Sequence, residues 1–278
     1  METTRQSTFE SRLFYFTLAL LLIFYLPALV DLVSDWYTDS NYSHGFFIPV
    51  ISFFLIWKNR KLLSGLEIAP SRSGLILIAA GIALFILGNG ASEYFTVRFS
   101  LIVVIFGLAL LYFGVPVLRR VWFALAFLVF MIPVPYVLYF SATFPMQLLA
   151  SKVAAGFLNA IGMPIVRQGN ILLLADQALE VAEACSGMRS LVSLLALGAL
   201  YAYFSQRRLS ARIILFAASV PIAIIGNIGR VTVTAIIAHI SEINVNAEPL
   251  HSILGASVFV IALILLVVFG IILGKIYE

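Results

Sequence analysis

Charged residues are scarce in this chain: they make up 11% of its 278 residues, whereas 62% are hydrophobic. Soluble domains carry roughly 25% charged residues because their surfaces face water. The composition therefore excludes an ordinary soluble domain and predicts an all-α integral membrane protein. The net charge of +4 comes from short Lys and Arg clusters between apolar runs rather than from a basic stripe, so we expect membrane lipid and no nucleic acid as a partner.

Cysteine occurs only once, at Cys185. A single cysteine excludes an internal disulfide and any metal site built from several cysteines. The other residue types that ligate metals are scattered along the chain, so we expect neither a metal nor an organic cofactor. Two interpretations of Cys185 stay open, a reactive thiol and a small buried apolar residue.

Internal repeats, low-complexity tracts and long linkers are also absent from the sequence, which indicates one membrane domain over residues 1–278. A helix needs about 20 apolar residues to cross a membrane, and the chain has room for about eight such spans. The apolar runs that we expect to cross are 13–33, 45–57, 73–91, 99–117, 121–138, 187–204, 213–238 and 252–274. The first run lacks a small-residue cleavage pattern, so we interpret it as an anchor.

Loop charges give the orientation, because cytoplasmic loops retain Lys and Arg. The basic clusters are Lys58, Arg60, Lys61 and Arg72; Arg119 and Arg120; and Arg207, Arg208 and Arg212. These three loops alternate along the chain as cytoplasmic loops should, so both termini are expected inside the cell. The segments expected outside are 34–44, 92–98, 139–186 and 239–251.

The outer segment 139–186 has two parts with different patterns. Its first part mixes polar residues with apolar ones, which is typical of an interfacial or re-entrant helix. In its second part, Gly169 and Asn170 signal a turn, and the short apolar runs that follow are broken by Asp176 and Gln177. This pattern predicts a hairpin in a small extracytoplasmic structure.

Cys185 directly precedes an apolar run that starts near Leu191, which places its thiol at the N-terminal end of a helix. Unpaired backbone N–H groups and the helix dipole favour a thiolate at such an end. Arg189, four residues later, adds positive charge one turn away. Glu183 is a candidate to orient Arg189 or Arg230, although a surface carboxylate at a helix start is an equally simple interpretation.

Arg230 lies inside an apolar run that reaches from Ile213 to Ile240. An arginine at this depth usually faces a protein interior or a watery cavity and marks function, while the alternative is that it snorkels to the interface. At 1.5 Å per residue, the helix rises about 27 Å from Arg212, which puts the guanidinium near the outer boundary of the hydrocarbon. Gly226 and Gly229, with Asn227 between them, favour close approach of another backbone or a local break that exposes polar groups.

His251 follows Pro249 and is expected in the first turn of the last apolar helix, again on the outer side. A histidine there can exchange a proton near neutral pH, or it can be an interfacial residue without a chemical role. His44 belongs to another outer loop and is a candidate to join the site. His239 competes with His251, but its apolar setting favours a packing role.

Three separate segments thus bring a thiol, a guanidinium and an imidazole to one face of the membrane. These are the parts that acyl transfer through a thioester requires, although other membrane proteins also carry three such groups near one face.

The order and spacing of these residues resemble the exosortase and archaeosortase family. The resemblance rests on Glu183 to Ser190, on Gly226 to Arg230, on His251 with Gly255, and on the upstream segments Tyr42 to Gly45 and Val166 to Asn170. It implies a cysteine transpeptidase of the cell inner (cytoplasmic) membrane whose active site faces outward. Such an enzyme cleaves a C-terminal sorting signal of the PEP-CTERM type, followed by a transmembrane helix, and transfers the protein to an acceptor linked to surface or exopolysaccharide export.

In this interpretation Cys185 is the nucleophile, Arg230 stabilises the oxyanion or orients the substrate, and His251 transfers protons. The acceptor is unknown, and simple hydrolysis differs only in the final nucleophile. A non-enzymatic transport or assembly component of polysaccharide or lipid export is the alternative from another class. The alternative has less support, because few charges lie within the expected spans and no matching pair of broken spans is seen.

Overall fold

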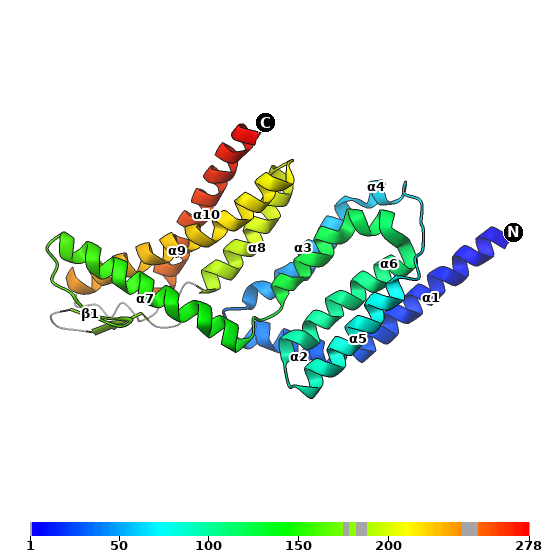
Figure 1. The fold of residues 1–278 in the computed structure, drawn as a ribbon, viewed down its shortest axis with the longest axis horizontal. Coiled ribbons are helices and arrows are strands. Elements are labelled where there is room, and N and C mark those ends of the chain that lie inside the picture. Colours follow the sequence, from blue (N-terminus) through cyan, green and yellow to red (C-terminus); the bar gives the residue numbers. More distant parts are fainter. Residues whose placement is uncertain (1, 175–177, 182–187, 241–249, 278) are drawn as a thin grey trace. The chain divides into compact units, whose positions relative to one another are not determined.

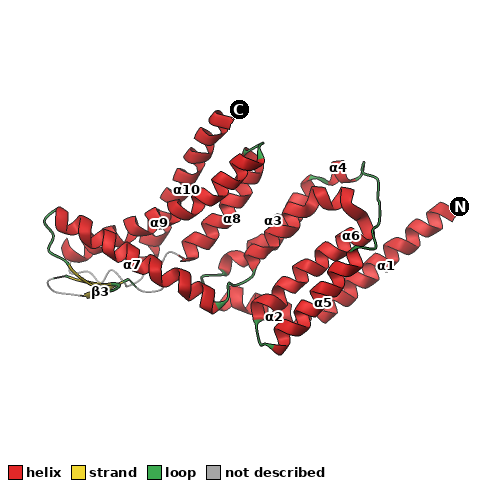
Figure 2. Ribbon diagram, in the orientation of Figure 1, coloured by secondary structure: helices red, strands yellow, loops and turns green. Residues whose placement is uncertain are grey.

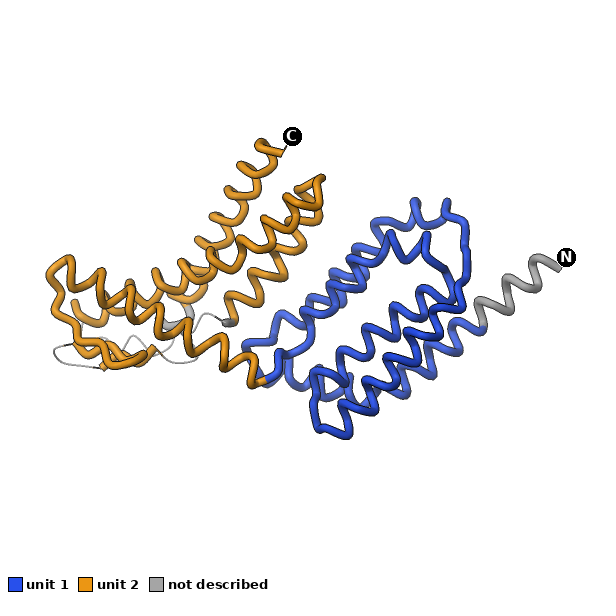
Figure 3. Tube along the Cα trace, in the orientation of Figure 1, with its two compact units in different colours: residues 1–135 blue, residues 136–278 orange. Residues whose placement is uncertain are grey.

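A computed structural model of the chain describes residues 2–174, 178–181, 188–240 and 250–277. Helices make up 82% of the structure, which confirms the expected all-α membrane class. The chain forms two compact units, Met1–Pro135 and Tyr136–Glu278, which are described separately below (Figure 3).

Unit 1 consists of apolar helices joined by short loops (Figures 1 and 2). Its elements are α1 (Glu2–Phe24), α2 (Leu26–Thr38), the 3₁₀ helix η1 (Ser43–Phe46), α3 (Phe47–Lys58), α4 (Arg60–Leu63), α5 (Gly74–Gly90), α6 (Tyr94–Phe127) and the 3₁₀ helix η2 (Leu128–Met131). The first two helices meet at an angle of 62°. Pro27 in the first turn of α2 explains this bend, because a proline cannot donate a hydrogen bond to the preceding helix.

Polar side chains inside unit 1 are paired with side chains or backbone carbonyls of other elements. The Arg98 guanidinium of α6 lies 2.7 Å from the Asp35 carboxylate of α2. The Trp36 indole N–H donates to the carbonyl of Met131 at 2.8 Å, and the Ser52 hydroxyl donates to the carbonyl of Ala124 at 2.7 Å. These contacts hold α2 and α3 against α6 and η2, and they satisfy groups that are unfavourable in an apolar interior when left unpaired.

Helix α6 reverses direction at Gly114, whose φ of 77° and ψ of −176° are not helical (Figure 1). Such a break frees carbonyl groups from the helix. The loop before α5 compensates for two of them, because the backbone N–H groups of Ala69 and Ser71 donate to the carbonyls of Phe113 and Leu110 at 3.4 and 3.2 Å. The chain can therefore turn inside an apolar unit with these carbonyl groups satisfied.

Unit 2 combines four helices with a small sheet among its described residues (Figure 2). Its elements are α7 (Tyr136–Ala160), β1 (Val166–Gln168), β2 (Ile171–Leu173), β3 (Ala178–Glu180), α8 (Met188–Ser205), α9 (Leu209–Ile240) and α10 (Leu250–Tyr277). The sheet is antiparallel in the order β1-β2-β3. The expected hairpin is confirmed: Gln168 pairs with Ile171 across a turn in which Gly169 adopts a φ of 64°, a conformation that glycine allows.

Two apolar clusters hold unit 2 together. In the first, the sheet packs on α7 and α9 through buried residues that include Leu158, Leu172 and Ala235. In the second, α8, α9 and α10 pack together around Leu194, Leu215 and Leu266. Helix α9 belongs to both clusters and therefore connects the sheet to the helix bundle.

The number of spans differs from the sequence-based expectation of eight. Among the described residues, three helices are long and apolar enough to cross a membrane: Tyr94–Met131, Leu209–Ile240 and Ile253–Tyr277. The bent pair Leu13–Phe24 and Leu26–Thr38 makes a fourth if it counts as one span. The expected runs 13–33, 213–238 and 252–274 correspond to these helices.

Helix length and helix breaks explain the difference. The expected spans 45–57, 73–91 and 187–204 form the shorter apolar helices Ser43–Lys58, Gly74–Gly90 and Arg189–Ser205, each of which has 10–17 residues. At 1.5 Å per residue such helices are at most about 25 Å long, short of the roughly 30 Å of hydrocarbon. The expected span 99–117 and most of the expected span 121–138 lie within Tyr94–Met131, where Gly114 interrupts the helix.

Candidate active site

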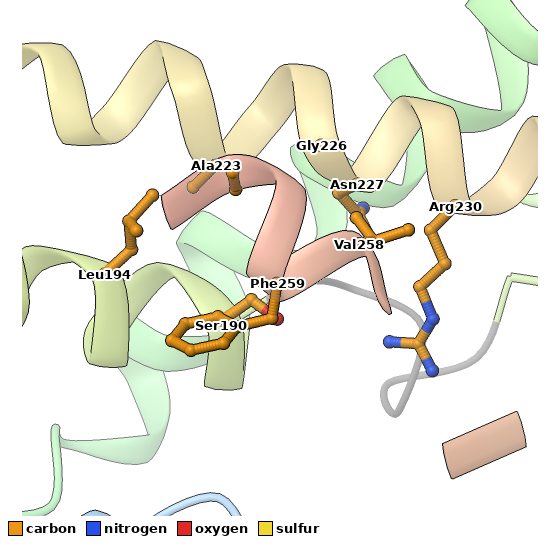
Figure 4. A pocket seen from close by; sticks show the side chains of 9 residues that line it. Ser190, Leu194, Ala223, Gly226, Asn227, Arg230, Val258 and Phe259 are labelled. Carbon is orange, nitrogen blue, oxygen red and sulfur yellow. The ribbon is translucent and has the colours of Figure 1, made fainter. Parts of the chain in front are cut away.

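Arg230 lies in the interior of unit 2, on helix α9, with 9% of its surface exposed. Asn227, three residues earlier on the same helix face, is 4% exposed. Both residues line a small pocket with Ser190 of α8 and Val258 of α10 (Figure 4). The arginine therefore faces other helices of its unit and does not snorkel into water, as an interfacial arginine would.

A second small pocket lies between Arg230 and the sheet. Glu180 of β3 and Val181, which follows it, line this pocket together with Thr234 of α9. Each of the two pockets has a volume of about 10 Å³, which is room for about one water molecule. The guanidinium is thus closely surrounded, and the free space near it suits a group the size of a single oxygen atom.

Helix α10 approaches Arg230 at Gly255. A Cβ added to Gly255 would lie 3.3 Å from the Cζ and Nη2 atoms of Arg230. The absence of a side chain at position 255 therefore leaves the space that the guanidinium needs. His251 belongs to the first turn of α10, four residues before Gly255, so the helix backbone brings position 251 within about one turn of this contact.

Cys185 and Glu183 lie outside the described residues. The residues on either side of them are described: Val181 and Ser190 each line one of the two pockets that Arg230 shares. Helix α8 starts at Met188, a few residues earlier than the expected start near Leu191. Arg189 lies in its first turn with an exposed side chain.

A polar cluster under the sheet holds the segment that leads to Cys185. The backbone N–H of Val181 donates to the Asn170 carbonyl at 3.0 Å, and the Asn170 side-chain amide donates to the Val181 carbonyl at 3.3 Å. The same amide lies 3.4 Å from Oε1 of Gln147 on α7, while the Ser151 hydroxyl donates to the Gly169 carbonyl at 3.0 Å. These contacts fix the end of β3 against α7.

The role of Gln147 and Ser151 was not predicted from the sequence. The interleaved polar residues of α7 indicated an interfacial or re-entrant helix; in the structure Gln147 is 5% exposed and Ser151 is fully buried. Their spacing of four residues is the signal that was available, because residues i and i+4 lie on the same helix face. Together with Thr143 they form a polar stripe, which the turn at Gly169 and Asn170 partly covers.

His44 lies in unit 1, in η1, and is half-buried. Burial lowers the pKa of His44 below its ordinary value of 6.5, and the nearby backbone of Phe130 and Asn41 only partly offsets this effect. Since the two units are described separately, the participation of His44 in a site with Arg230 stays a prediction.

Metal ligands do not gather in the described part of the chain, where no group of three or more His, Cys, Asp or Glu side chains is placed to hold an ion. The absence of a cofactor remains an expectation from the sequence.

Comparison with known proteins adds one finding to this geometry. Residues 36–268 match the family model described as transmembrane exosortase, so the match covers most of the chain and parts of both units. The chain has no match among curated proteins or among solved structures.

Proposed function

Because the chain belongs to the transmembrane exosortase family, with a membrane transpeptidase or protease type of role, we propose that it cleaves C-terminal sorting signals through a thioester on Cys185. The substrate is a protein whose C-terminus carries a PEP-CTERM-type motif and a transmembrane helix. Cleavage takes place at the outer face of the cell inner membrane. The acyl group then passes to an acceptor linked to surface polysaccharide export, or to water.

The observation that carries this proposal is the position of Arg230. Val181 and Ser190 each line a pocket together with Arg230, and Gly255 of α10 lies beside its guanidinium. Cys185 is four residues from Val181, so an extended chain limits their separation to about 14 Å. His251 lies one helical turn from Gly255. The fold therefore supports an arrangement in which a thiol, a guanidinium and an imidazole share one site.

The proposed reaction starts with the thiolate. Cys185 precedes the first turn of α8, where free N–H groups, the helix dipole and Arg189 favour the ionised sulfur. The sulfur attacks the scissile carbonyl and forms a tetrahedral oxyanion. Arg230, whose planar guanidinium is always charged, stabilises this oxyanion in a site that contains little water.

His251 completes the proton transfers. When the carbon–nitrogen bond breaks, the leaving amine takes a proton from His251, and the acyl group stays on Cys185 as a thioester. The incoming nucleophile then gives a proton to His251 and attacks the thioester carbonyl. The carbon–sulfur bond breaks, and Cys185 returns as a thiolate. Glu183, Asn227 and His44 are proposed to orient the reacting groups.

The proposed orientation of the chain in the membrane is inferred from two positions along α9. The basic turn with Arg207, Arg208 and Arg212 precedes or begins the helix, and Arg230 lies about 27 Å further along its axis. If the basic turn is cytoplasmic, as the distribution of Lys and Arg favours, Arg230 is close to the outer surface. The sheet and the segment with Cys185 then lie on the outer side as well.

Processing of a defined substrate tests the proposal. The full-length chain is reconstituted in vesicles with a protein that carries a Pro-Glu-Pro tail followed by a transmembrane helix and basic residues. Wild-type protein should cleave the tail, while Cys185→Ala should leave it intact and insert normally. Mass spectrometry of the new C-terminus then separates water from an amine, lipid or glycan acceptor. Normal cleavage by Cys185→Ala would exclude the thioester mechanism and leave the transport alternative.

The side of the membrane is tested separately. A membrane-impermeant thiol reagent added outside sealed, right-side-out vesicles should modify Cys185, the only thiol in the chain. Modification that occurs only from the cytoplasmic side would contradict an outer active site, even if cleavage were observed.

A further inference from the structure

Unit 2 has a hollow at the opposite end of α9 from Arg230. Its volume is about 510 Å³, and it is lined by Ser205, Gln206, Arg207, Arg208, Gly274 and Tyr277. The lining comes from the end of α8, the turn between α8 and α9, and the last turns of α10. A volume of this size is in the range of small-molecule binding sites.

The inner wall of this hollow is fixed by side chains that already have partners. The Gln206 amide donates to the carbonyl of Gly270 at 2.9 Å and contacts the Ser205 hydroxyl at 3.2 Å. Arg212 donates from Nε to the Gln206 carbonyl at 2.8 Å, and its guanidinium lies 5.2 Å from the centre of the Tyr203 ring. None of these contacts that hold the wall in place involves Arg207 or Arg208.

Arg207 and Arg208 line the same hollow with exposed side chains. Among the described residues that line the hollow there is no carboxylate, and neither guanidinium forms an ion pair with this part of the chain. Two arginines without an acidic partner, beside the free backbone N–H groups at the start of α9, produce a positive concavity. Guanidinium groups bind phosphate oxygens through paired hydrogen bonds.

The hollow also lies at the ends of two candidate membrane spans, Leu209–Ile240 and Ile253–Tyr277. Apolar side chains next to it are exposed: Ile213 by 58%, Ile272 by 51% and Ile276 by 71%. The phosphate of a lipid bound between the arginines would therefore have its acyl chains beside apolar helix surfaces. Tyr277 lies at the boundary, where tyrosine is enriched in membrane proteins.

We propose that this hollow binds the phosphate head group of an anionic membrane lipid through Arg207 and Arg208. The phosphate group is the shared chemistry of a lipid head group and a free phosphate ion, and the exposed apolar surfaces favour the lipid. This site is separate from the proposed active site, and it does not depend on the proposed reaction.

Lipid-dependent thermal unfolding of the full-length chain in a non-ionic detergent tests the proposal. Added phosphatidylglycerol should raise the Tm of the wild-type protein, whereas phosphatidylcholine and inorganic phosphate at equal concentration should have little effect. In Arg207→Gln/Arg208→Gln, the apparent affinity for phosphatidylglycerol should fall about 30-fold, since each basic residue near a membrane surface contributes roughly a factor of five.

Arg119→Gln/Arg120→Gln is the matched control, because it removes the same charge from an exposed pair on α6 in unit 1. The control should keep the wild-type response to phosphatidylglycerol. An equal loss in both double variants would show general attraction to anionic lipid and overturn the site. A response to inorganic phosphate as large as that to lipid would exclude a lipid as the ligand.

Native mass spectrometry gives a second readout in case the double variant is unstable. Wild-type protein released from mixed micelles should retain phosphatidylglycerol, and each single variant, Arg207→Gln or Arg208→Gln, should retain less. Equal retention of phosphatidylglycerol and phosphatidylcholine by the wild-type protein would show that the hollow does not select an anionic head group, and the proposal would be wrong.

Discussion

Each unit of the molecule buries one arginine among its described residues, and the two side chains have different surroundings. Arg98 of unit 1 is 6% exposed and forms an ion pair with Asp35 at 2.7 Å. Arg230 of unit 2 is 9% exposed, and its guanidinium lies against Gly255 between two small pockets. The first arginine joins two helices through a carboxylate, while the second adjoins the segments that flank Cys185.

We expect this difference to separate a structural role for Arg98 from the chemical role proposed for Arg230. A buried charge is strongly unfavourable unless other groups compensate for it. The ion pair with Asp35 compensates for Arg98, so we expect changes at Arg98 or Asp35 to affect stability. In the proposed site Arg230 stabilises a developing negative charge, so we expect changes there to affect the rate of reaction.

The largest effect should come from replacing Arg230 by lysine, and Arg98→Lys is its control. Arg230→Lys should lower kcat by about 10²–10³-fold, because removing one oxyanion-stabilising donor has an effect of this size and lysine lacks the planar fork. Arg98→Lys keeps the positive charge beside Asp35, so its activity should stay close to wild type. Steady-state cleavage in vesicles measures both variants. Equal losses in the two would show that Arg230 is also only structural.

A second test removes the carboxylate of the ion pair between Asp35 and Arg98 in unit 1. Asp35→Asn leaves the Arg98 guanidinium without its carboxylate, so the free energy of unfolding should fall by about 1–3 kcal/mol. Cleavage per folded molecule should not change. Denaturant unfolding monitored by circular dichroism measures the loss, and Asp35→Asn/Arg98→Met should recover part of it. A loss of cleavage without a loss of stability would contradict the structural role of this pair.

A smaller effect is expected at the contact between α10 and Arg230. In Gly255→Ala the new Cβ would lie 3.3 Å from two guanidinium atoms, so the side chain must shift slightly. We expect kcat/KM to fall about tenfold, because small displacements of catalytic groups have effects of this order. The thermal stability should stay equal or rise, since alanine favours a helix.

Gly226→Ala is the control for this change. Its new Cβ would make ordinary contacts of 3.5 Å with Ala262 and Val258, and its activity should remain near wild type. If both alanine variants lost activity equally, the effect would come from helix packing rather than from the position of the guanidinium.

The smallest effect is expected at His44, on the pH dependence of the stability of unit 1. Burial lowers the pKa of His44 below 6.5, so the folded state binds fewer protons than the unfolded state near this pH. The folded state therefore keeps its full stability above about pH 6.5 and loses part of it as the pH falls below this value, because the unfolded state then binds the extra proton. His44→Gln should remove this part of the pH dependence in unfolding measured between about pH 8 and pH 5. An unchanged pH profile would show that His44 does not titrate differently in the folded protein.

Sequence patterns predicted the elements of this fold better than the number of membrane spans. The scarcity of charge predicted the helical membrane class, and Gly169 with Asn170 predicted the hairpin, because both signals act locally. The count of spans failed at the runs 45–57, 73–91 and 187–204, because helices form there at nearly the expected bounds but are too short to count as spans. The third strand, Ala178–Glu180, was not predicted because it pairs with β2 across intervening residues.

The candidate site was predicted unevenly for a similar reason. Arg230 stood out because a charge in a long apolar run is unusual, and its interior position agrees with one of the two sequence-based interpretations. Gln147 could not be recognised, since its partner Asn170 lies 23 residues away and only folding brings them together. Arg98 was counted with the outer segment 92–98, because its partner Asp35 lies even further away along the chain. The roles of Cys185, Glu183 and His251 stay predictions.

The reversal at Gly114 also limits how the gene can vary. Any larger residue at this codon would place its Cβ on the carbonyl oxygen of Ala69, and its backbone would be strained at a φ of 77°. By contrast, Gly156 has open space around it and an ordinary φ. A library that samples every amino acid should therefore tolerate many substitutions at codon 156 and retain glycine at codon 114, whatever reaction the other unit performs.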